Sequence, residues 1–471
     1  MNDIEFVAGI SAPLATEYRN AKRYVADVPT QSLLHVRSFA HQLTELLAAP
    51  AAVTFDSPNL YNRIEQLNRL RLTDVRVTRA LHRLRADGNR GAHPEKYHLQ
   101  PAQLQQLARK AIRDVLKLVE RLYPQLLQQA APAYRFEEFD ALSGHELCFR
   151  AVMQDDAEAQ YLLGMSFKSR ALMARQQEQA LTPDDDPLPQ QAQHHLQKAA
   201  YWFAQAAAAD PRALFEHGVA LLHGYQGEAD VAKGQQLIAQ AAQANVVDAM
   251  ALLGYFYLVG SGDISCNAAL AQQYLSAAAA KEHSEAMANL GVLYYQQGDL
   301  SSAFMHIKQA AQSGYPHAQY HLSLMLARGE GCEQDPAASE QWLAEAAEQG
   351  QLDAMLARAR HMLDQESQFG HDMSQAESYL RQVIRYGHSV PAMIELAIAL
   401  TDGCLGRIDV VEAAAWLTLA KRRANEQERQ VIAPLWQSLA EQVERVLPLT
   451  QDKEERRSLQ RAKALLADSP S

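Results

Sequence analysis

One segment of the sequence, residues 59–93, has the residue types and the spacing for phosphate chemistry. It holds eight arginines against three carboxylates, a local net charge of +5, whereas the whole chain of 471 residues carries −11 at pH 7. An arginine guanidinium can neutralise a phosphate, and a histidine imidazole can move a proton at neutral pH. The candidate polar or phosphate-binding residues are Arg76, Arg79, Arg83, Arg85, Asn89, Arg90 and His93.

Three of these arginines, Arg76, Arg79 and Arg83, recur at intervals of three and four residues. A helix over residues 73–86 would therefore place them on one face. The remainder of the chain carries −16 once the +5 of this segment is set aside. The chain as a whole is thus not built to coat nucleic acid or anionic lipid, and this segment is where a phosphate-bearing partner would be expected.

A tight turn is predicted to follow that helix. Gly88 and Gly91 are the residues that favour a turn at this point. The turn would bring Asn89 and His93 back toward Arg85.

Three interpretations of the turn stay open. In the first it is structural: Asn89 and His93 bind backbone groups of the loop, and Arg85 pairs with Asp87 or Glu65. In the second it binds a phosphate-bearing ligand or nucleic acid without catalysis. In the third it is catalytic, with the arginine neutralising a scissile phosphate while the histidine moves the proton.

From about residue 155 onward the sequence repeats one phrase. Each copy opens with A-x-x-x-L-G or a variant, and the anchor alanines from Ala213 onward are 36, 37, 32, 36 and 38 residues apart. A pair of small residues closes each copy, three residues before a Gly or Asn that can end a helix in the left-handed conformation. Lys281 departs from that rule. The anchor alanines are Ala159, Ala213, Ala249, Ala286, Ala318, Ala354 and Ala392.

Each copy predicts two helices joined by a turn. Alanine and glycine at the anchors let neighbouring helices approach closely, and one copy can bury its apolar face only by stacking on the next. The sequence therefore predicts a right-handed α-solenoid of about seven two-helix repeats. Half of the tyrosines on the first helices should be core, and the rest could line the concave face where solenoids bind peptides; they are Tyr255, Tyr257, Tyr294 and Tyr295.

The first 130 residues lack this repeat. Helical patterns over 11–26, 30–48, 58–70, 73–86 and 101–128 predict a separate helical bundle. The fold class is therefore all-α.

The predicted domains follow from these patterns: a bundle over 1–130, a linker helix over 131–154, the solenoid over 155–425 and capping helices over 426–471. Within the first repeat, three acids bracketed by prolines at 182–189 predict a protruding loop.

Composition narrows the function class. Hydrophobic residues make up 48% and charged residues 21%, which is ordinary for a chain that buries a core. The four cysteines are far apart and form no C-x-x-C pair, so we expect no metal site, and no motif calls for a cofactor. No secretory signal and no apolar stretch long enough to cross a bilayer is apparent. We expect a soluble cytoplasmic protein without membrane association.

The repeated A-x-x-x-L-G phrase with its terminal A-A-x-x-G resembles the Sel-1-like repeat family, which is similar to tetratricopeptide arrays. The resemblance covers roughly residues 155–425, about seven copies. It implies a curved interaction scaffold and no catalytic residue.

The bundle resembles a second family through two phrases, L-x-x-R-I-x-x-L at 60–67 and L-R-x-x-G-N-x-x-A-H at 84–93. This is a helical domain-of-unknown-function family that also occurs at the start of type I restriction-enzyme motor subunits. It is similar to HEPN-type bundles, some of which are metal-independent ribonucleases that use an Arg and a His. The resemblance implies Arg85 or Arg90 together with His93 as the residues of such a site.

Two hypotheses on function follow. The first is a non-enzymatic adaptor, with a protein partner on the concave face of the solenoid and a second binding function in the basic bundle. The alternative is a nucleic-acid-binding protein, or a HEPN-like ribonuclease or defence-associated protein, that acts through the bundle.

Overall fold

The computed structural model of the chain is built from helices. Among the residues that it describes, the regular structure consists of helices α1 to α23 and one short 3-10 helix, and no β-strand occurs there. The predicted all-α class is therefore confirmed. The described residues are 1–26, 28–57, 59–92, 101–138, 143–179, 190–364 and 372–467.

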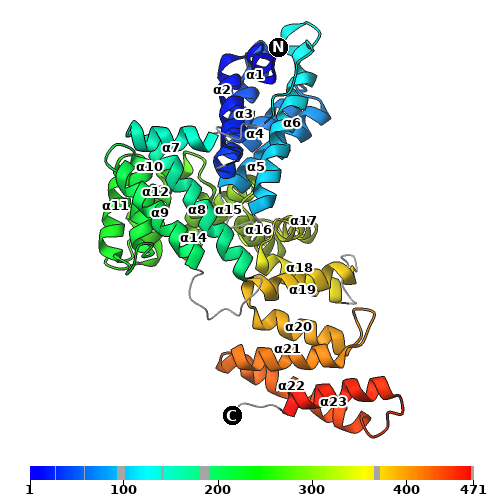
Figure 1. The fold of residues 1–471 in the computed structure, drawn as a ribbon. Helices are drawn as coiled ribbons and strands as arrows, with labels where there is room; N and C mark the ends of the chain where they lie inside the picture. Colours follow the sequence, from blue (N-terminus) through cyan, green and yellow to red (C-terminus); the bar gives the residue numbers. More distant parts are fainter. Residues whose placement is uncertain are drawn as a thin grey trace. The chain divides into compact units, whose positions relative to one another are not determined.

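Two compact units make up the structure (Figure 1). The first comprises Met1–Ala318 with Glu330–Cys332, and the second comprises Gln319–Gly329 with Glu333–Ser471. The first unit thus contains both the predicted bundle and the first repeats. The predicted domain limits at 130, 154 and 425 remain predictions.

The bundle at the start of the first unit is centred on α3. This helix packs against α2, α4, α5 and α6, and its buried side chains include Leu33, Phe39 and Leu43. Five of the helices lie within two residues of the predicted segments at their starts, and α1 was not predicted. The helices are α1 (Asp3–Ala8), α2 (Ala12–Tyr24), α3 (Pro29–Ala48), the 3-10 helix (Ala49–Ala51), α4 (Leu60–Arg69), α5 (Val75–Ala92) and α6 (Pro101–Leu127).

A buried charge network ties α1 to α2. The carboxylate of Asp3 is fully buried and accepts hydrogen bonds of 2.7 Å from Lys22 Nζ and from the hydroxyl of Tyr18. Lys22 Nζ also donates to the carbonyl of Glu137, at 2.7 Å. A buried carboxylate is tolerated because its charge and its lone pairs are satisfied in this way.

The prediction of a tight turn at Gly88 and Gly91 is wrong. Helix α5 continues through both glycines to Ala92. A Cβ added at Gly88 would lie 2.4 Å from Arg37 Cβ, and one added at Gly91 would lie 2.4 Å from Leu33 Cβ. The two glycines therefore let α3 and α5 pack closely. Glycine suits such a contact as well as a turn, because it has no side chain to keep the helices apart.

The repeats of the first unit follow as helix pairs. In three of these pairs, the later helix begins after an Asp or Asn whose side chain caps it: Asp230, Asn267 and Asp299. The helices are α7 (Ser143–Met153), α8 (Ala157–Gln179), α9 (Gln190–Ala206), α10 (Pro211–Leu222), α11 (Val231–Gln243), α12 (Val247–Val259), α13 (Ala268–Ala279), α14 (Ser284–Gln296) and α15 (Leu300–Gln312). The predicted loop at 182–189 lies outside the described residues.

The anchor glycines pack against the partner helix of their own repeat. A Cβ at Gly254 would lie 2.8 Å from Leu275 Cγ, and one at Gly291 would lie 2.7 Å from Ile307 Cγ1. The anchor alanines Ala249 and Ala286 are fully buried. The small residues thus bring the two helices of each repeat together, as the sequence predicts.

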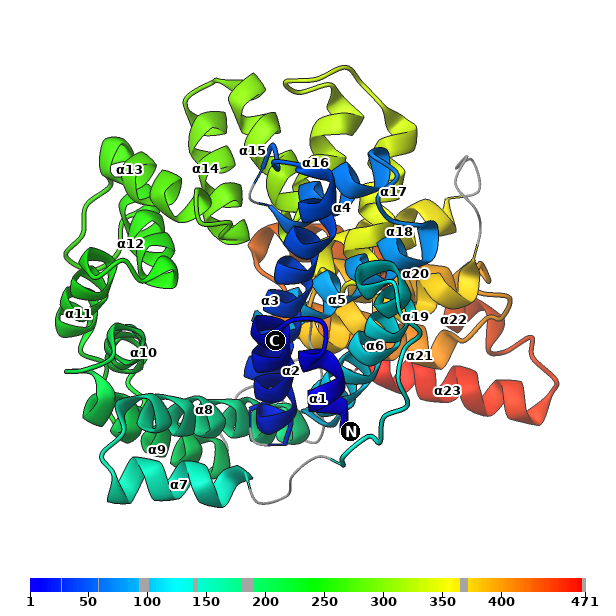
Figure 2. The ribbon, with the colours of Figure 1, turned by 90° about the horizontal axis from the view of Figure 1, so that it is seen from above.

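These repeats curve, with their first helices on the inner side. In Figure 2, α8, α10 and α12 line the inside of the arc, and α9, α11 and α13 lie outside them. The side of α12 that turns away from α13 therefore faces the inside of the arc.

The left-handed residue at the end of each repeat agrees with the sequence in part. Asn245 and Gly314 have φ of 65° and 87°, as predicted. In the copy with Lys281 the left-handed residue is the next one, Glu282, with φ of 65°, and in the copy with Gly387 it is His388, with φ of 47°.

The second unit continues the pattern of helix pairs. It contains most of α16 and the helices to the end of the described chain, in which α21 packs against both α22 and α23. Their bounds are α16 (Pro316–Arg328), α17 (Pro336–Glu348), α18 (Leu352–Leu363), α19 (Met373–Gly387), α20 (Val390–Thr401), α21 (Val410–Arg423), α22 (Glu426–Val446) and α23 (Lys453–Ala467).

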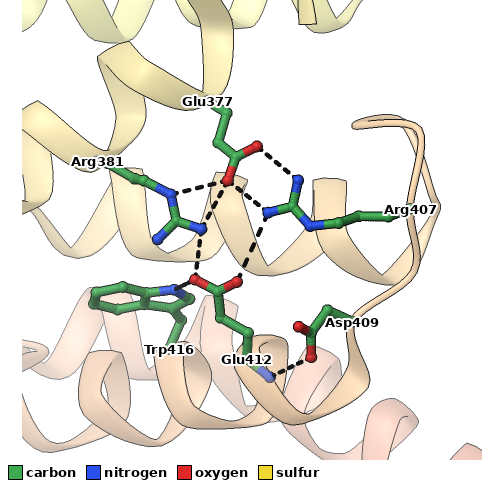
Figure 3. A network of polar contacts seen from close by, with 6 residues as sticks. All are labelled: Glu377, Arg381, Arg407, Asp409, Glu412 and Trp416. Carbon is green, nitrogen blue, oxygen red and sulfur yellow. Dashed lines mark hydrogen bonds and ion pairs between the residues drawn. The ribbon is translucent and has the colours of Figure 1, made fainter. Parts of the chain in front are cut away.

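An ion-pair network joins α19 to α21 in this unit (Figure 3). Glu377 accepts from Arg381 at 2.7 Å and from Arg407 at 2.6 Å, and Arg381 also lies 2.7 Å from Glu412. The indole of Trp416 donates to Glu412 at 3.1 Å. Hydrogen bonds from Arg407, in the first place, hold the pKa of Glu377 at about 2.

Candidate functional site where the bundle meets the repeats

Two of the predicted site residues contact the repeats across the first unit. Arg85 Nη1 donates a hydrogen bond of 2.8 Å to the carbonyl of Gln312, and the side-chain amide of Asn89 donates to the carbonyl of Ser313. Gln312 is the last residue of α15, and Ser313 is its C-cap. The last carbonyls of a helix have no partner within it and carry the negative end of the helix dipole. The bundle therefore caps a helix of the array with one cation and one amide.

Gly314 allows this close approach. Its φ of 87° is left-handed, and a Cβ at this position would lie 3.0 Å from Asn89 Nδ2 and 3.4 Å from Arg85 Nη1. The glycine thus serves both the end of α15 and the contact with the bundle.

The side chain of Arg85 is held in place from the bundle. Its guanidinium lies over the ring of Tyr61, with 5.1 Å between Cζ and the ring centroid, and the residue is 9% exposed. A guanidinium stacked on an aromatic ring is attracted by the ring and keeps its edge free to donate. Tyr61 therefore helps to aim Arg85 at α15.

A second contact lies at the end of the preceding repeat. Arg37 of α3 and Glu282 form an ion pair of 3.6 Å. Burial raises the pKa of Glu282, and the charges of Arg37 and Arg63 oppose that shift. Because Glu282 is the left-handed residue after α13, the irregular end of this repeat presents its carboxylate to the bundle.

A third contact lies at the start of the array. Tyr24, the last residue of α2, packs against the apolar cluster of α7, α8 and α9, which includes Leu147, Leu162 and Phe203. The bundle thus touches the array near its first repeat and again at the ends of α13 and α15, and in Figure 2 it lies across the opening of the arc.

The structure does not gather the predicted site residues into one site. Arg90 pairs with Asp87 at 3.1 Å, and burial raises the pKa of that carboxyl. Glu65 lies 2.8 Å from His82. The two acids suggested as partners of Arg85 thus have other partners, and the backbone group that Asn89 binds belongs to the repeats. His93 lies outside the described residues.

The remaining three candidates form a separate surface. Arg76, Arg79 and Arg83 are all exposed. Their helix positions lie about half a turn from Arg85, at 100° per residue. One side of α5 therefore binds the array while the other faces solvent.

The inner side of the arc carries exposed apolar side chains. On α12, Leu252 is half-buried, and Tyr255 and Val259 are 41% and 47% exposed. The other predicted tyrosines differ in their surroundings: Tyr257 stacks on Tyr274 and Tyr294 stacks on His306, with 5.9 Å and 5.3 Å between ring centroids, whereas Tyr295 is exposed and donates to Glu330. Tyr255 is thus the tyrosine presented to the inside of the arc.

Sequence reasoning missed half of this contact. Arg37, Glu282 and the 312–314 segment were not among the predicted site residues. The one available signal was Lys281, which breaks the rule for helix ends and directs attention to Glu282 beside it.

Two families match the chain. A domain of unknown function, DUF4145, matches residues 19–138. The Sel1 repeat matches residues 187–210, 211–246, 247–283, 284–315, 316–351 and 390–425. The array is therefore a Sel1-like solenoid, whereas the likeness of the bundle to HEPN-type domains stays a prediction. No curated relative matches the chain.

Several solved structures are similar to this one. A Sel1 repeat protein from Oxalobacter formigenes is 23% identical, covers 62% of this chain and 90% of its own, and has a TM-score of 0.44. The protective antigen c5321 of uropathogenic Escherichia coli, which has an SLR fold, is 18% identical. The match covers 78% of this chain and 94% of the antigen, with a TM-score of 0.34. Yeast Tom70 is 13% identical, and the match covers 98% of this chain and 96% of Tom70, with a TM-score of 0.35. At these scores the similarities carry no information on function.

Proposed function

We propose that this chain is a protein-binding scaffold that holds its partner on the inner face of the Sel1-like repeats. The observation that carries the proposal is the apolar stripe on the inner side of α12, in which Tyr255 and Val259 are exposed and Leu252 is half-buried. Large apolar and aromatic side chains at the centre of a concave surface supply most of the binding energy in protein interfaces.

The bundle supports this function as a brace between two parts of the array, which we call the strut. It contacts the array through Tyr24 at one end and through Arg37, Arg85 and Asn89 at the other. Fixing both ends limits how far the intervening repeats can bend. A surface that is already in its binding shape loses less conformational entropy when a partner binds.

Two further features of the proposal concern its setting. No described helix combines the length and the apolar character that a membrane span needs. An adaptor without catalytic activity in the cytoplasm agrees with the sequence-based expectation, and both the absence of catalysis and the location stay predictions.

The test compares two double variants of the full chain. Tyr255→Lys with Val259→Lys places two charges on the inner stripe, whereas Tyr201→Lys with Met305→Lys places the same charges on exposed apolar positions of α9 and α15. The inner variant should lose at least tenfold of each protein that co-purifies specifically with the chain from its native host, and the outer variant should keep it. Equal retention by both variants, or equal loss, would overturn the proposal.

Ribonuclease or nucleic-acid-directed activity of the bundle is the second candidate from the sequence. The two arginines considered for this activity have partners within the chain: Arg85 binds the carbonyl of Gln312, and Arg90 pairs with Asp87. The matching test is cleavage of a labelled RNA by the full chain and by His93→Ala. Cleavage that the variant loses while its melting temperature is kept would establish the activity.

A further inference from the structure

An uncompensated row of cations runs along the solvent side of α5. Arg76, Arg79 and Arg83 are exposed, and within the described residues none of them forms an ion pair with a carboxylate. Arg76 and Arg83 are seven positions apart, which is about 10 Å along the helix at 1.5 Å per residue. We call these three residues the arginine row.

The acids beside the arginine row are paired with other cations. Asp74 lies 2.6 Å from Arg121, which lowers the pKa of its carboxyl through a hydrogen bond. Asp87 lies 3.1 Å from Arg90. Because these two carboxylates pair with Arg121 and Arg90, they do not neutralise the arginine row.

The neighbouring helix α6 adds positive charge to the same side. The contact of Asp74 with Arg121, and the effect of Lys110 on Asp87, show that α5 and α6 run antiparallel side by side (Figure 1). Lys110 of α6 is exposed and acts on Asp87, whereas Asp114 on the same helix pairs with Lys117 at 3.5 Å. Helix α6 therefore adds at least one cation next to the end of the arginine row.

We infer that the arginine row binds the phosphate backbone of a nucleic acid. Three arginines over about 10 Å match about three phosphate steps of a duplex strand, which advance about 3.4 Å each along the axis. Arginine binds phosphate with two parallel hydrogen bonds. Contacts of this kind position a nucleic acid without reading its sequence.

The proposal is independent of the scaffold function. Arg85 and Asn89 bind the array from the opposite side of α5, so a nucleic acid on the arginine row leaves the strut in place. The repeats would then hold a protein while the bundle holds a nucleic acid.

The experiment measures binding of the full chain to a labelled 20-base-pair duplex and to a 20-nucleotide single strand by fluorescence anisotropy. With three phosphates neutralised, the slope of log K against log salt should be about −2.7 for the duplex and about −2.1 for the single strand. Raising salt from 50 to 200 mM should therefore weaken duplex binding about 40-fold. Arg76→Gln with Arg79→Gln and Arg83→Gln should lower the affinity at 50 mM at least tenfold and flatten the slope.

Two controls make the result decisive. Arg456→Gln with Arg457→Gln and Arg461→Gln removes the same charge from exposed positions of α23 and should leave binding unchanged. Poly-glutamate of matched charge serves as a competitor. An unchanged affinity in the row variant, a salt-independent affinity, or competition by poly-glutamate as strong as by unlabelled duplex would overturn the proposal, the last in favour of an acidic protein partner.

Discussion

The guanidinium of Arg85 donates a hydrogen bond of 2.8 Å to the carbonyl of Gln312, a residue 227 positions further along the chain. Four residues after Arg85, Asn89 donates to the carbonyl of Ser313, so two successive turns of α5 satisfy two carbonyls at the end of α15. This contact fixes the bundle to the array, and the first prediction tests its strength.

Arg85→Ala should weaken the contact by about 1.5–3 kcal/mol, because it leaves a helix-end carbonyl without its charged donor. Asn89→Ala should cost about 1 kcal/mol, and the double variant should show coupling because both side chains bind the same helix end. A chain of two compact units is not expected to unfold in one step, so the measurement is hydrogen exchange of the amides of α5 and α15. Arg79→Ala is the control, and unchanged exchange in Arg85→Ala would contradict the prediction.

Gly314→Ala should destabilise the first unit more than Gly298→Ala does. Both glycines are left-handed, with φ of 87° and 82°, so both variants carry the cost of that conformation, about 1–2 kcal/mol. Only at position 314 would the added Cβ meet a neighbour, Asn89 Nδ2 at 3.0 Å, whereas nothing lies within 4 Å at position 298. Hydrogen exchange of the amides of α15 in the two variants tests this, and equal acceleration would mean that the contact with the bundle tolerates a methyl group.

Gly91→Ala should destabilise the bundle although alanine is the better helix former. In an open helix interior the change would gain about 1 kcal/mol. Here the new Cβ would lie 2.4 Å from Leu33 Cβ, and an overpacked contact of this kind costs about 1–3 kcal/mol. Ala86→Gly, at a half-buried site on the same helix, is the control for propensity. Slower hydrogen exchange of the α3 and α5 amides in Gly91→Ala than in the unchanged chain would argue against close packing of these two helices.

Glu377 should make the second unit sensitive to acid. Its pKa is about 2 in the folded chain against an ordinary 4.5, so its ion pairs with Arg381 and Arg407 stabilise the fold above pH 4.5. That stabilisation is lost progressively as the pH falls from about 4.5 toward 2, because the folded carboxylate must then take up a proton.

The measurement for Glu377 is the stability of the chain as a function of pH, followed by hydrogen exchange in α19 and α21. Glu377→Gln should be less stable at neutral pH and should lose the dependence between pH 4.5 and 2. Glu444→Gln removes an exposed ion pair with Lys463 and should leave the profile as it is. A wild-type profile without an acid limb in these two helices would contradict the assignment.

The sequence by itself determined the helices and the repeats. Apolar spacing and capping residues act within a few positions of the chain, so five bundle helices begin within two residues of their predicted starts, and Ala249 and Ala286 are buried as expected. The left-handed ends at Asn245 and Gly314 were equally predictable, because a helix end is set by the residues that form it.

Only the tertiary structure decided what the polar residues of the bundle do. Gly88 and Gly91 suit a turn and a close helix contact equally well, and the proximity of α3 selects the contact. The partners of Arg85 and Asn89 lie 227 and 224 residues away, and a single pair of contacts over that distance leaves no period in the sequence. The spacing of residues along the chain determines where helices form, whereas the choice of a distant partner depends on which surfaces the folded chain brings together.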